Sequence, residues 1–259
     1  NHAAAEAGTV YGMMYNQRTN PLFKKMREII TSGELGNIRR TNWIITDWFR
    51  PQAYYESSPW RATWSGKGGG VLLNQSIHNL DLMQWICGMP SRVRAFCHEG
   101  KWHDIEVEDD VTAYLEYPTG ATGVFVTSTG EAPGTNRFEI SCDRGKLLFE
   151  HNALTVYRTD EDIREFSLSA KDGFAKPGVA VVELATEGEY TAHAGVMNAF
   201  AGAVLHGGPL VAEGTEGIHA VMLANAMHLS SWQSKPVVLA LDEAAFSKAL
   251  AKKIADAEA

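Results

Sequence analysis

The sequence predicts an α+β fold, built on a large, mostly antiparallel, open sheet with helices packed on one face. Three observations lead to this prediction: helical spacing comes first, a run of alternating segments follows, and helical spacing returns towards the C-terminus. Consecutive strands joined by short turns are typical of an antiparallel sheet. The chain has 259 residues and is 45% hydrophobic, which is enough to bury a sizeable core.

The first residues form a segment of their own. Residues 1–8 (NHAAAEAG) have the pattern of the last turns of a helix ended by a glycine, and residues 9–15 (TVYGMMY) predict a buried strand. A protein rarely begins inside a helix. We therefore expect the chain to be a piece of a longer protein.

Two elements then lead to a long loop. Residues 21–32 (PLFKKMREIITS) have apolar side chains at helical spacing, begin with proline and are followed by Gly33, which predicts a helix. Residues 37–49 are rich in Ile and Trp, and they predict a strand. Residues 50–70 (RPQAYYESSPWRATWSGKGGG) show no regular period, and loops of this length are usually functional.

The elements that follow supply the sheet and its covering helices. A second helix is predicted at residues 71–87 and ends at Gly88. Strands are predicted at 93–98, 111–117, 121–128, 137–141, 146–150 and 154–157. Beyond a loop at 171–178, we expect helices at 189–205 and 214–232, a short strand at 237–241, and a last helix capped by Asp242. The apolar run at 124–126 (VFV) makes both sheet faces partly apolar, so a homo-oligomer formed through the open face is expected.

Charge and cysteine content exclude several classes of protein. The formal net charge of −8 disfavours a nucleic-acid partner, because such binding is driven by Lys and Arg on phosphates. No run approaches the ~18 apolar residues of a membrane-spanning helix. The three cysteines are odd in number and widely spaced, which predicts neither a disulfide framework nor a metal site. Reduced thiols indicate a cytoplasmic protein.

The helix predicted at 71–87 carries the candidate chemistry. Apolar side chains cover most of its circumference, so it should be buried, yet Asn74, His78, Asp81 and Gln84 fall within about one third of the circle. A polar stripe on a buried helix needs partners or a cleft. Histidine is the natural acid/base near neutral pH, and Asn74, one turn away, could orient its ring. A satisfied core histidine remains the alternative.

At these residues the sequence resembles a known family. The run GGGVLLNQSIHNLDLMQWICGMP is similar to the substrate-domain signature of the glucose–fructose oxidoreductase / inositol dehydrogenase / rhizopine-catabolism (Gfo/Idh/MocA) oxidoreductases. The segments YNQRTNPLFKKMREIITSGELGNIR, IEVEDDVTAYLEYPTGATG and EYTAHAGVMNAFAGAVLHGGP resemble further parts of the same domain. The runs HLSSW and KPVVL resemble its C-terminal part, and together these segments are distributed over nearly the whole chain.

The resemblance implies a Rossmann NAD(P)-binding domain followed by an α+β domain that often forms oligomers. Residues 1–18 would then be a remnant of the end of the Rossmann domain, and residues 19–259 the substrate-binding and oligomerisation domain. NAD or NADP would belong to the full-length parent, because the chain contains no G-x-G-x-x-G motif after a strand. The family's Glu-Lys-Pro lysine is also absent from this sequence.

The resemblance also implies roles for individual residues. His78 matches the histidine that takes the hydroxyl proton, and Asn74 would position substrate or His78, since an amide cannot ionise. Lesser substrate contacts are expected from residues that matching segments place near the substrate. These are Arg61, Trp60, Arg18, Trp64, Tyr55 and His193. For Arg18, a salt bridge across the domain junction fits equally well.

The expected function is that of the substrate domain of an NAD(P)-dependent oxidoreductase. Its substrate would be a secondary alcohol of a sugar, inositol or related polyol, and the fragment alone is expected to be inactive. A non-catalytic ligand-sensing regulator, or a scaffold domain of the same family, is the alternative. The acidic cluster at 106–110 is expected to lie in a solvated turn, and His228 is expected to be structural.

Overall fold

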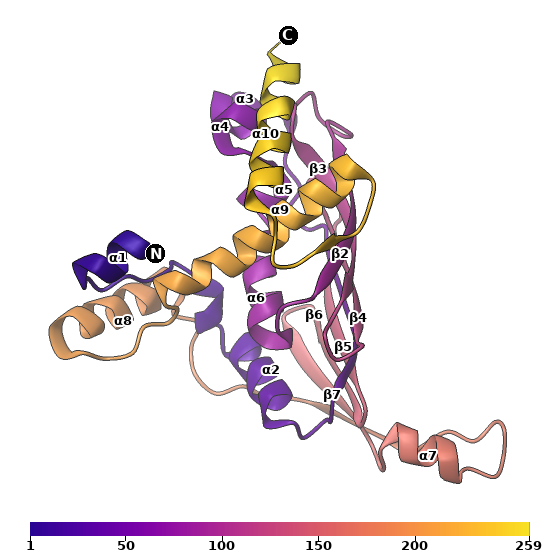
Figure 1. Cartoon of the computed structure of the whole chain (residues 1–259). Coiled ribbons are helices and arrows are strands. Elements are labelled where there is room, and N and C mark those ends of the chain that lie inside the picture. The colour runs from indigo at the N-terminus through magenta and orange to yellow at the C-terminus, as the bar shows by residue number, and fades with distance from the viewer. Residues whose placement is uncertain (259) are drawn as a thin grey trace.

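A single nine-stranded sheet organises the molecule, with most of its helices on one side and α7 beyond one end (Figure 1). The computed structural model describes residues 1–258. The strands are β1 Ile38–Ile45, β2 Arg92–Glu99, β3 Glu108–Glu116, β4 Thr122–Ser128, β5 Asn136–Cys142, β6 Gly145–Glu150, β7 Ala153–Thr159, β8 Val179–Glu183 and β9 Val237–Val238. Their order across the sheet is β8-β7-β6-β5-β1-β4-β3-β2-β9. The predicted α+β fold with a mostly antiparallel open sheet is confirmed.

Strand β1 breaks the antiparallel pattern in the middle of the sheet. It lies between β4 and β5, parallel to β4 and antiparallel to β5. Strands that follow one another along the chain therefore pair only on either side of β1, as β2-β3-β4 and as β5-β6-β7-β8. The sheet is thus two antiparallel meanders joined by a strand from earlier in the sequence.

The helices differ widely in length. They are α1 His2–Ala7, α2 Pro21–Ser32, α3 Gln52–Glu56, α4 Trp64–Lys67, α5 Val71–Asn74, α6 Ile77–Cys87, α7 Ile163–Ser169, α8 Ala192–His206, α9 Gly217–Gln233 and α10 Glu243–Ala257. Short 3-10 turns lie at η1 Asn16–Thr19, η2 Pro59–Arg61 and η3 Gly214–Glu216. Helix α2 has the predicted bounds: the Asn20 side chain accepts from the Leu22 amide, Pro21 opens the helix and Gly33, with φ of 73°, ends it.

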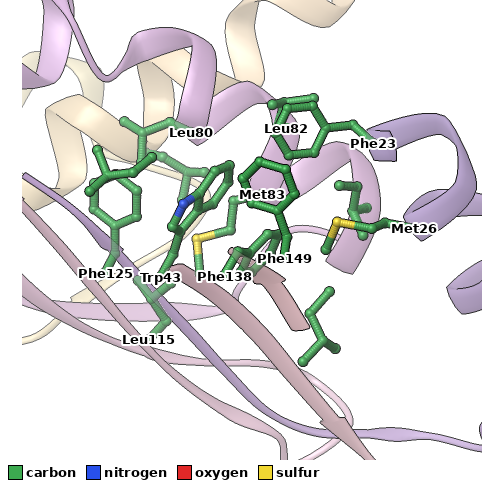
Figure 2. Close-up of a cluster of buried hydrophobic side chains, with 14 of the residues drawn as sticks. Phe23, Met26, Trp43, Leu80, Leu82, Met83, Leu115, Phe125, Phe138 and Phe149 are labelled. Atoms are coloured by element: carbon green, nitrogen blue, oxygen red, sulfur yellow. The ribbon is translucent and has the colours of Figure 1, made fainter. Parts of the chain in front are cut away.

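The core lies between the sheet and helices α2, α6 and α9. On the buried face, Phe125, Trp43, Phe138 and Phe149 lie opposite one another on neighbouring strands. Trp43 stacks on Phe138, with ring centroids 4.1 Å apart. Figure 2 shows these aromatic rings beneath side chains of α2 and α6. Stacked aromatic rings contribute both buried area and geometric preference to such a core.

On the opposite face, no helix among residues 1–258 covers the central strands, and α7 lies beyond one end of the sheet (Figure 1). Tyr114 and Val124 are register partners on this face, and Ile44 and Val126 form a second pair. Phe96 is 52% exposed and Tyr114 is 43% exposed. The apolar character expected for the open face is therefore present, on the strands around β4.

The structure corrects four details of the sequence prediction. Residues 9–15 are not a buried strand: only Gly12 forms a β-bridge, with Glu213, and no strand lies beside this segment among the described residues. The helix expected at 71–87 is interrupted between α5 and α6. The loop at 50–70 contains the short elements α3, η2 and α4. Helix α7 and strand β8 were not expected.

No helix within residues 1–258 is long and apolar enough to cross a membrane.

Candidate functional site

The segment that runs from α3 to α6 carries most of the predicted site residues, and Gly70 fixes its position against β3. A Cβ atom on Gly70 would lie 2.0 Å from the carbonyl oxygen of Glu108, so only glycine fits there. The Glu108 carboxylate accepts hydrogen bonds from the amides of Gly70 and Leu72, at 2.8 and 3.0 Å. The start of α5 is thereby held against the start of β3.

Glu108 also forms a buried ion pair with His228 of α9. The carboxylate lies 3.1 Å from Nε2 of His228, and both side chains are 0% exposed. Burial by itself would raise the pKa of Glu108, but the neighbouring His228 and the hydrogen bonds from the two backbone amides hold it below its ordinary value. His228 contacts the edge of Trp64 and stacks on Trp232.

The acidic cluster at 106–110 is therefore not a solvated turn, as the sequence suggested. Glu108 and Asp109 are both fully buried. The Asp109 carboxylate accepts hydrogen bonds from the amides of Lys101, Trp102 and His103. It also lies 2.8 Å from Nδ1 of His103. The expectation failed because the turn at 101–103 folds back onto Asp109 and supplies these donors, which the acidic composition of the cluster does not reveal.

The hydroxyl oxygen of Tyr54 is a point where three side-chain donors meet. Nη1 of Arg61 lies 2.7 Å away, Nδ2 of Asn74 lies 2.6 Å away, and Nε2 of Gln75 lies 3.3 Å away. Nζ of Lys67 donates to Oδ1 of Asn74 at 2.8 Å. Both ends of the Asn74 amide are thus engaged, which fixes its orientation next to the first turn of α6.

His78 lies in the first turn of α6 and is half-buried. Its Nδ1 atom is buried without a hydrogen-bond partner, and its ring meets that of Tyr15 edge-on at 6.2 Å. Burial lowers the pKa of His78, Asp81 opposes that effect, and His193 and Lys67 lower the pKa further. The imidazole is therefore neutral at neutral pH, the form that can accept a proton.

Arg18 occupies the centre of a buried ionic cluster. Its guanidinium contacts both oxygens of Asp81, at 2.9 and 2.7 Å, and donates to Glu216 at 2.6 Å. The Gln84 amide donates to Asp81 at 3.0 Å. The Arg18 side chain is only 1% exposed. The polar stripe of the 71–87 segment thus has partners at Asp81 and Gln84, and Arg18 joins η1 to α6 and η3.

Trp60, Arg61 and Lys67 gather beside Tyr54. The guanidinium of Arg61 lies 4.5 Å from the centroid of the Trp60 ring, and Nζ of Lys67 lies 5.0 Å from it. Trp60 itself is 40% exposed. Burial, and then the charge of Arg61, lower the pKa of Lys67. This group lies on the elements directly before α5, so it borders Asn74.

The other three predicted residues lie in different surroundings. Trp64 is 2% exposed and packs on His228 and Trp232. Tyr55 is 3% exposed, and its hydroxyl lies 2.7 Å from Oγ1 of Thr129. His193, on α8, is exposed and interacts electrostatically with His78.

The sequence did not point to Lys67, and it predicted a solvated turn for Glu108. The spacing between Lys67 and Asn74, across the three glycines, is a signal that could have identified the lysine. Nothing local to Glu108 could have paired it with His228, because the two residues lie on distant elements.

Within residues 1–258, no three His, Cys, Asp or Glu side chains are placed to hold a metal ion together. The only parallel strand pair in that range is β1 with β4, which lies inside an otherwise antiparallel sheet. A dinucleotide-binding fold needs successive parallel strands with a glycine-rich turn that leads into a helix. The strands of residues 1–258 do not form such a unit.

Comparison with known proteins gives the family context. Residues 23–148 match the model of the GFO/IDH/MocA C-terminal domain. Over 147 residues the chain is 24% identical to 1,5-anhydro-D-fructose reductase of Ensifer adhaerens, a match that covers 56% of this chain and 43% of the relative. It is 30% identical over 127 residues to trans-1,2-dihydrobenzene-1,2-diol dehydrogenase of Bos taurus, which covers 48% of this chain and 35% of the relative.

Solved structures share the fold. The WlbA dehydrogenase of Bordetella pertussis, in complex with NADH and UDP-GlcNAcA, has a TM-score of 0.76 at 22% identity and covers 93% of this chain. A levoglucosan dehydrogenase in complex with NADH and L-sorbose has a TM-score of 0.68 at 19% identity and covers 89%. In both comparisons the match spans 66% of the other chain.

The chain thus spans less than half the length of these two curated relatives and about two thirds of the solved structures. The region matched by the family model includes α2, the site segment from α3 to α6, and the central strands. Residues 23–148 thus match the C-terminal domain of the Gfo/Idh/MocA family of oxidoreductases.

Proposed function

We propose that this chain is the substrate domain of an NAD(P)-dependent oxidoreductase that acts on a secondary alcohol of a sugar, inositol or related polyol. The observation that carries the proposal is the state of His78. It is half-buried, its Nδ1 has no hydrogen-bond partner, and its pKa is lowered. A neutral imidazole on a fixed helix is suited to take the proton of an alcohol.

His78 acts as the acid/base in this proposal. Oxidation of a secondary alcohol to a ketone releases the hydroxyl proton, which His78 accepts, and the reverse reaction returns it. Protonated His78 lies within the electrostatic reach of Asp81, which favours the charged form. Asn74, held by Lys67 and Tyr54, positions the substrate beside His78.

The other site residues fall into two groups, according to how far their side chains are exposed to solvent. Trp60, Arg61 and His193 are accessible enough to contact substrate, and Trp60 offers an aromatic face to a sugar ring. Arg18, Trp64 and Tyr55 are nearly inaccessible, so we assign them to positioning the elements that carry the site. Arg18 does so by tying η1 to α6 through Asp81.

We assign the nicotinamide nucleotide to a separate Rossmann domain of the parent, because the strands of residues 1–258 do not form a dinucleotide-binding unit. Residues 1–18 would be the end of that domain. An apolar hollow lined by Met13, Met14, Val196, Met197 and Phe200 supports this partner, since it lies between the N-terminal segment and α8. Exposed apolar side chains that form one patch are typical of a surface that contacts another domain.

We also propose a homo-oligomer formed through the helix-free face of the sheet. Phe96, Tyr114 and Ile44 are exposed there. Light scattering on the purified chain tests this assignment. Tyr114→Glu should dissociate the oligomer, whereas a monomeric unmodified chain would contradict it.

The function is tested on the intact gene product with NAD⁺ and NADP⁺ and a panel of sugars and inositols. We expect turnover by the intact protein, and a fall in kcat of about 10² or more in His78→Gln. His206→Gln, at the exposed end of α8, is the matched control. The 259-residue chain alone should reduce neither nucleotide. Tight ligand binding without turnover by the intact protein would instead support a ligand-sensing regulator.

A further inference from the structure

We infer that the substrate of this site carries an acidic group, a carboxylate or a phosphate, that is bound by Arg61 and Lys67. The inference rests on the proposed function and deepens it, because it names the chemical class of the substrate. It follows from an excess of positive charges and of hydrogen-bond donors around Tyr54.

The first observation is an excess of positive charge. No carboxylate within residues 1–258 lies at ion-pair distance from Arg61 or Lys67. Both cations lie over the same Trp60 ring, at 4.5 and 5.0 Å from its centroid. The charge of Arg61 contributes to lowering the pKa of Lys67, which means that the two charges repel each other. In a chain with a formal charge of −8, such a pair favours a bound anion.

The second observation is a surplus of donors. Arg61, Asn74 and Gln75 all donate to the Tyr54 oxygen, and Lys67 donates to Asn74. An ammonium group has three N–H donors, and the one given to Asn74 leaves two. Nε of Arg61 is buried without a partner. The group therefore lacks acceptors, and a carboxylate or phosphate supplies several at once.

The third observation is the position of this cation pair relative to His78. Lys67 is linked to Asn74 directly, and Asn74 lies four residues before His78 across the break between α5 and α6. The charge of Lys67 also reaches His78, where it lowers the pKa. An acidic group held at Lys67 therefore belongs to a molecule that extends to His78. Lys67 and Arg61 would select that molecule, and His78 would act on its hydroxyl.

Isothermal titration calorimetry on the 259-residue chain tests the inference without requiring turnover. The probes are D-glucuronate and D-glucose 6-phosphate as the charged ligands, and D-glucuronamide and D-glucose as their neutral counterparts. We expect at least one charged probe to bind about tenfold or more tightly than its neutral counterpart, as loss of a charged hydrogen bond predicts. The two charged probes distinguish a carboxylate site from a phosphate site.

The variants identify the residues responsible. Lys67→Gln and Arg61→Gln should each abolish the preference for the charged probe, and Arg61→Lys should retain part of it. Lys248→Gln, which removes one positive charge from the exposed face of α10, is the matched control and should bind like the unmodified chain. Circular dichroism melting confirms that each variant is folded.

Three results would overturn the inference. The first is equal affinity for charged and neutral probes, and the second is no binding of either charged probe. The third is a preference that survives both Lys67→Gln and Arg61→Gln. Turnover of neutral polyols that depends on His78, without anion binding, would overturn this inference alone. Anion binding without turnover that depends on His78 would overturn the proposed function alone.

Discussion

The carboxylate of Glu108 and the imidazole of His228 form an ion pair 3.1 Å apart with neither side chain exposed to solvent. Glu108 also accepts two backbone hydrogen bonds at the start of α5, so the pair connects β3, α5 and α9. Glu108 is thus one of the attachments between the site segment from α3 to α6 and the sheet, beside the Ser76–Thr127 and Tyr55–Thr129 hydrogen bonds.

This ion pair predicts a loss of stability in acid. The pKa of Glu108 is lower in the folded chain than its ordinary value of 4.5. Its contribution to stability is therefore complete above about pH 4.5 and disappears as the pH falls through the lower, folded-state pKa. Urea unfolding measured across this range should give a free energy that decreases towards low pH. Glu108→Gln should flatten part of this dependence, and an unchanged slope would contradict the assignment.

Gly70→Ala should destabilise the chain markedly. The added Cβ would meet the Glu108 carbonyl oxygen at 2.0 Å, and backbone on both sides would have to move. Overpacking of this kind costs about 1–3 kcal/mol or more. Gly202→Ala is the matched control, since nothing lies within 4 Å of its added Cβ in α8. That variant should be neutral or more stable by up to about 1 kcal/mol. Thermal melting compares the two, and equal behaviour would argue against a close approach at Gly70.

The cluster around Arg18 predicts unequal effects of its two carboxylates. Asp81→Asn removes a fully buried partner and should cost about 3–5 kcal/mol of unfolding free energy. Glu216→Gln removes a carboxylate that is 31% exposed, so its cost should be smaller, about 1 kcal/mol. Urea denaturation followed by tryptophan fluorescence measures both values. A larger loss for Glu216→Gln would contradict the central position of the Arg18–Asp81 pair.

The activity of the intact protein should depend on pH through His78. Burial, His193 and Lys67 lower its pKa below the ordinary 6.5, so the imidazole stays neutral to a lower pH than a solvent-exposed histidine. In the direction of alcohol oxidation, kcat/KM should therefore remain high through pH 6.5 and fall only below it. Lys67→Met removes one of the charges that lower the pKa and should shift this fall to higher pH. A fall already centred above pH 6.5 in the unmodified protein would count against His78 as the base.

An element could be predicted from the sequence where residues within or next to that element determine its structure. Helix α2 could be bounded because Asn20, Pro21 and Gly33 specify its two ends within a few residues. The place of β1 could not be predicted, since its partners β4 and β5 lie far along the chain and strand alternation carries no information about pairing. The same limit explains why residues 9–15 were taken for a strand: their composition favours one, but no neighbouring strand is present within the described residues.

The candidate site was predictable in part for a similar reason. His78 and Asn74 could be identified because both lie within one short run next to three glycines. The arrangement around Tyr54 depends on hydrogen bonds that converge from three elements. The burial of Glu108 depends on His228, which comes from α9. Such long-range pairs are fixed by tertiary packing, which no single-sequence pattern contains.

The central place of β1 in the sheet has a consequence for how the chain is assembled. During synthesis β1 is made before its partner strands β4 and β5. Arg40 can pair with Thr122, and Trp43 with Phe138, only after those later strands have been synthesised. Each antiparallel meander can form on its own, but the two are joined only when β1 has paired with both β4 and β5. Pairing of β1 with both meanders is therefore a late step that depends on long-range contacts. Dependence on such contacts makes folding slow. A nascent chain that stops before Phe138 would lack the ring on which Trp43 stacks.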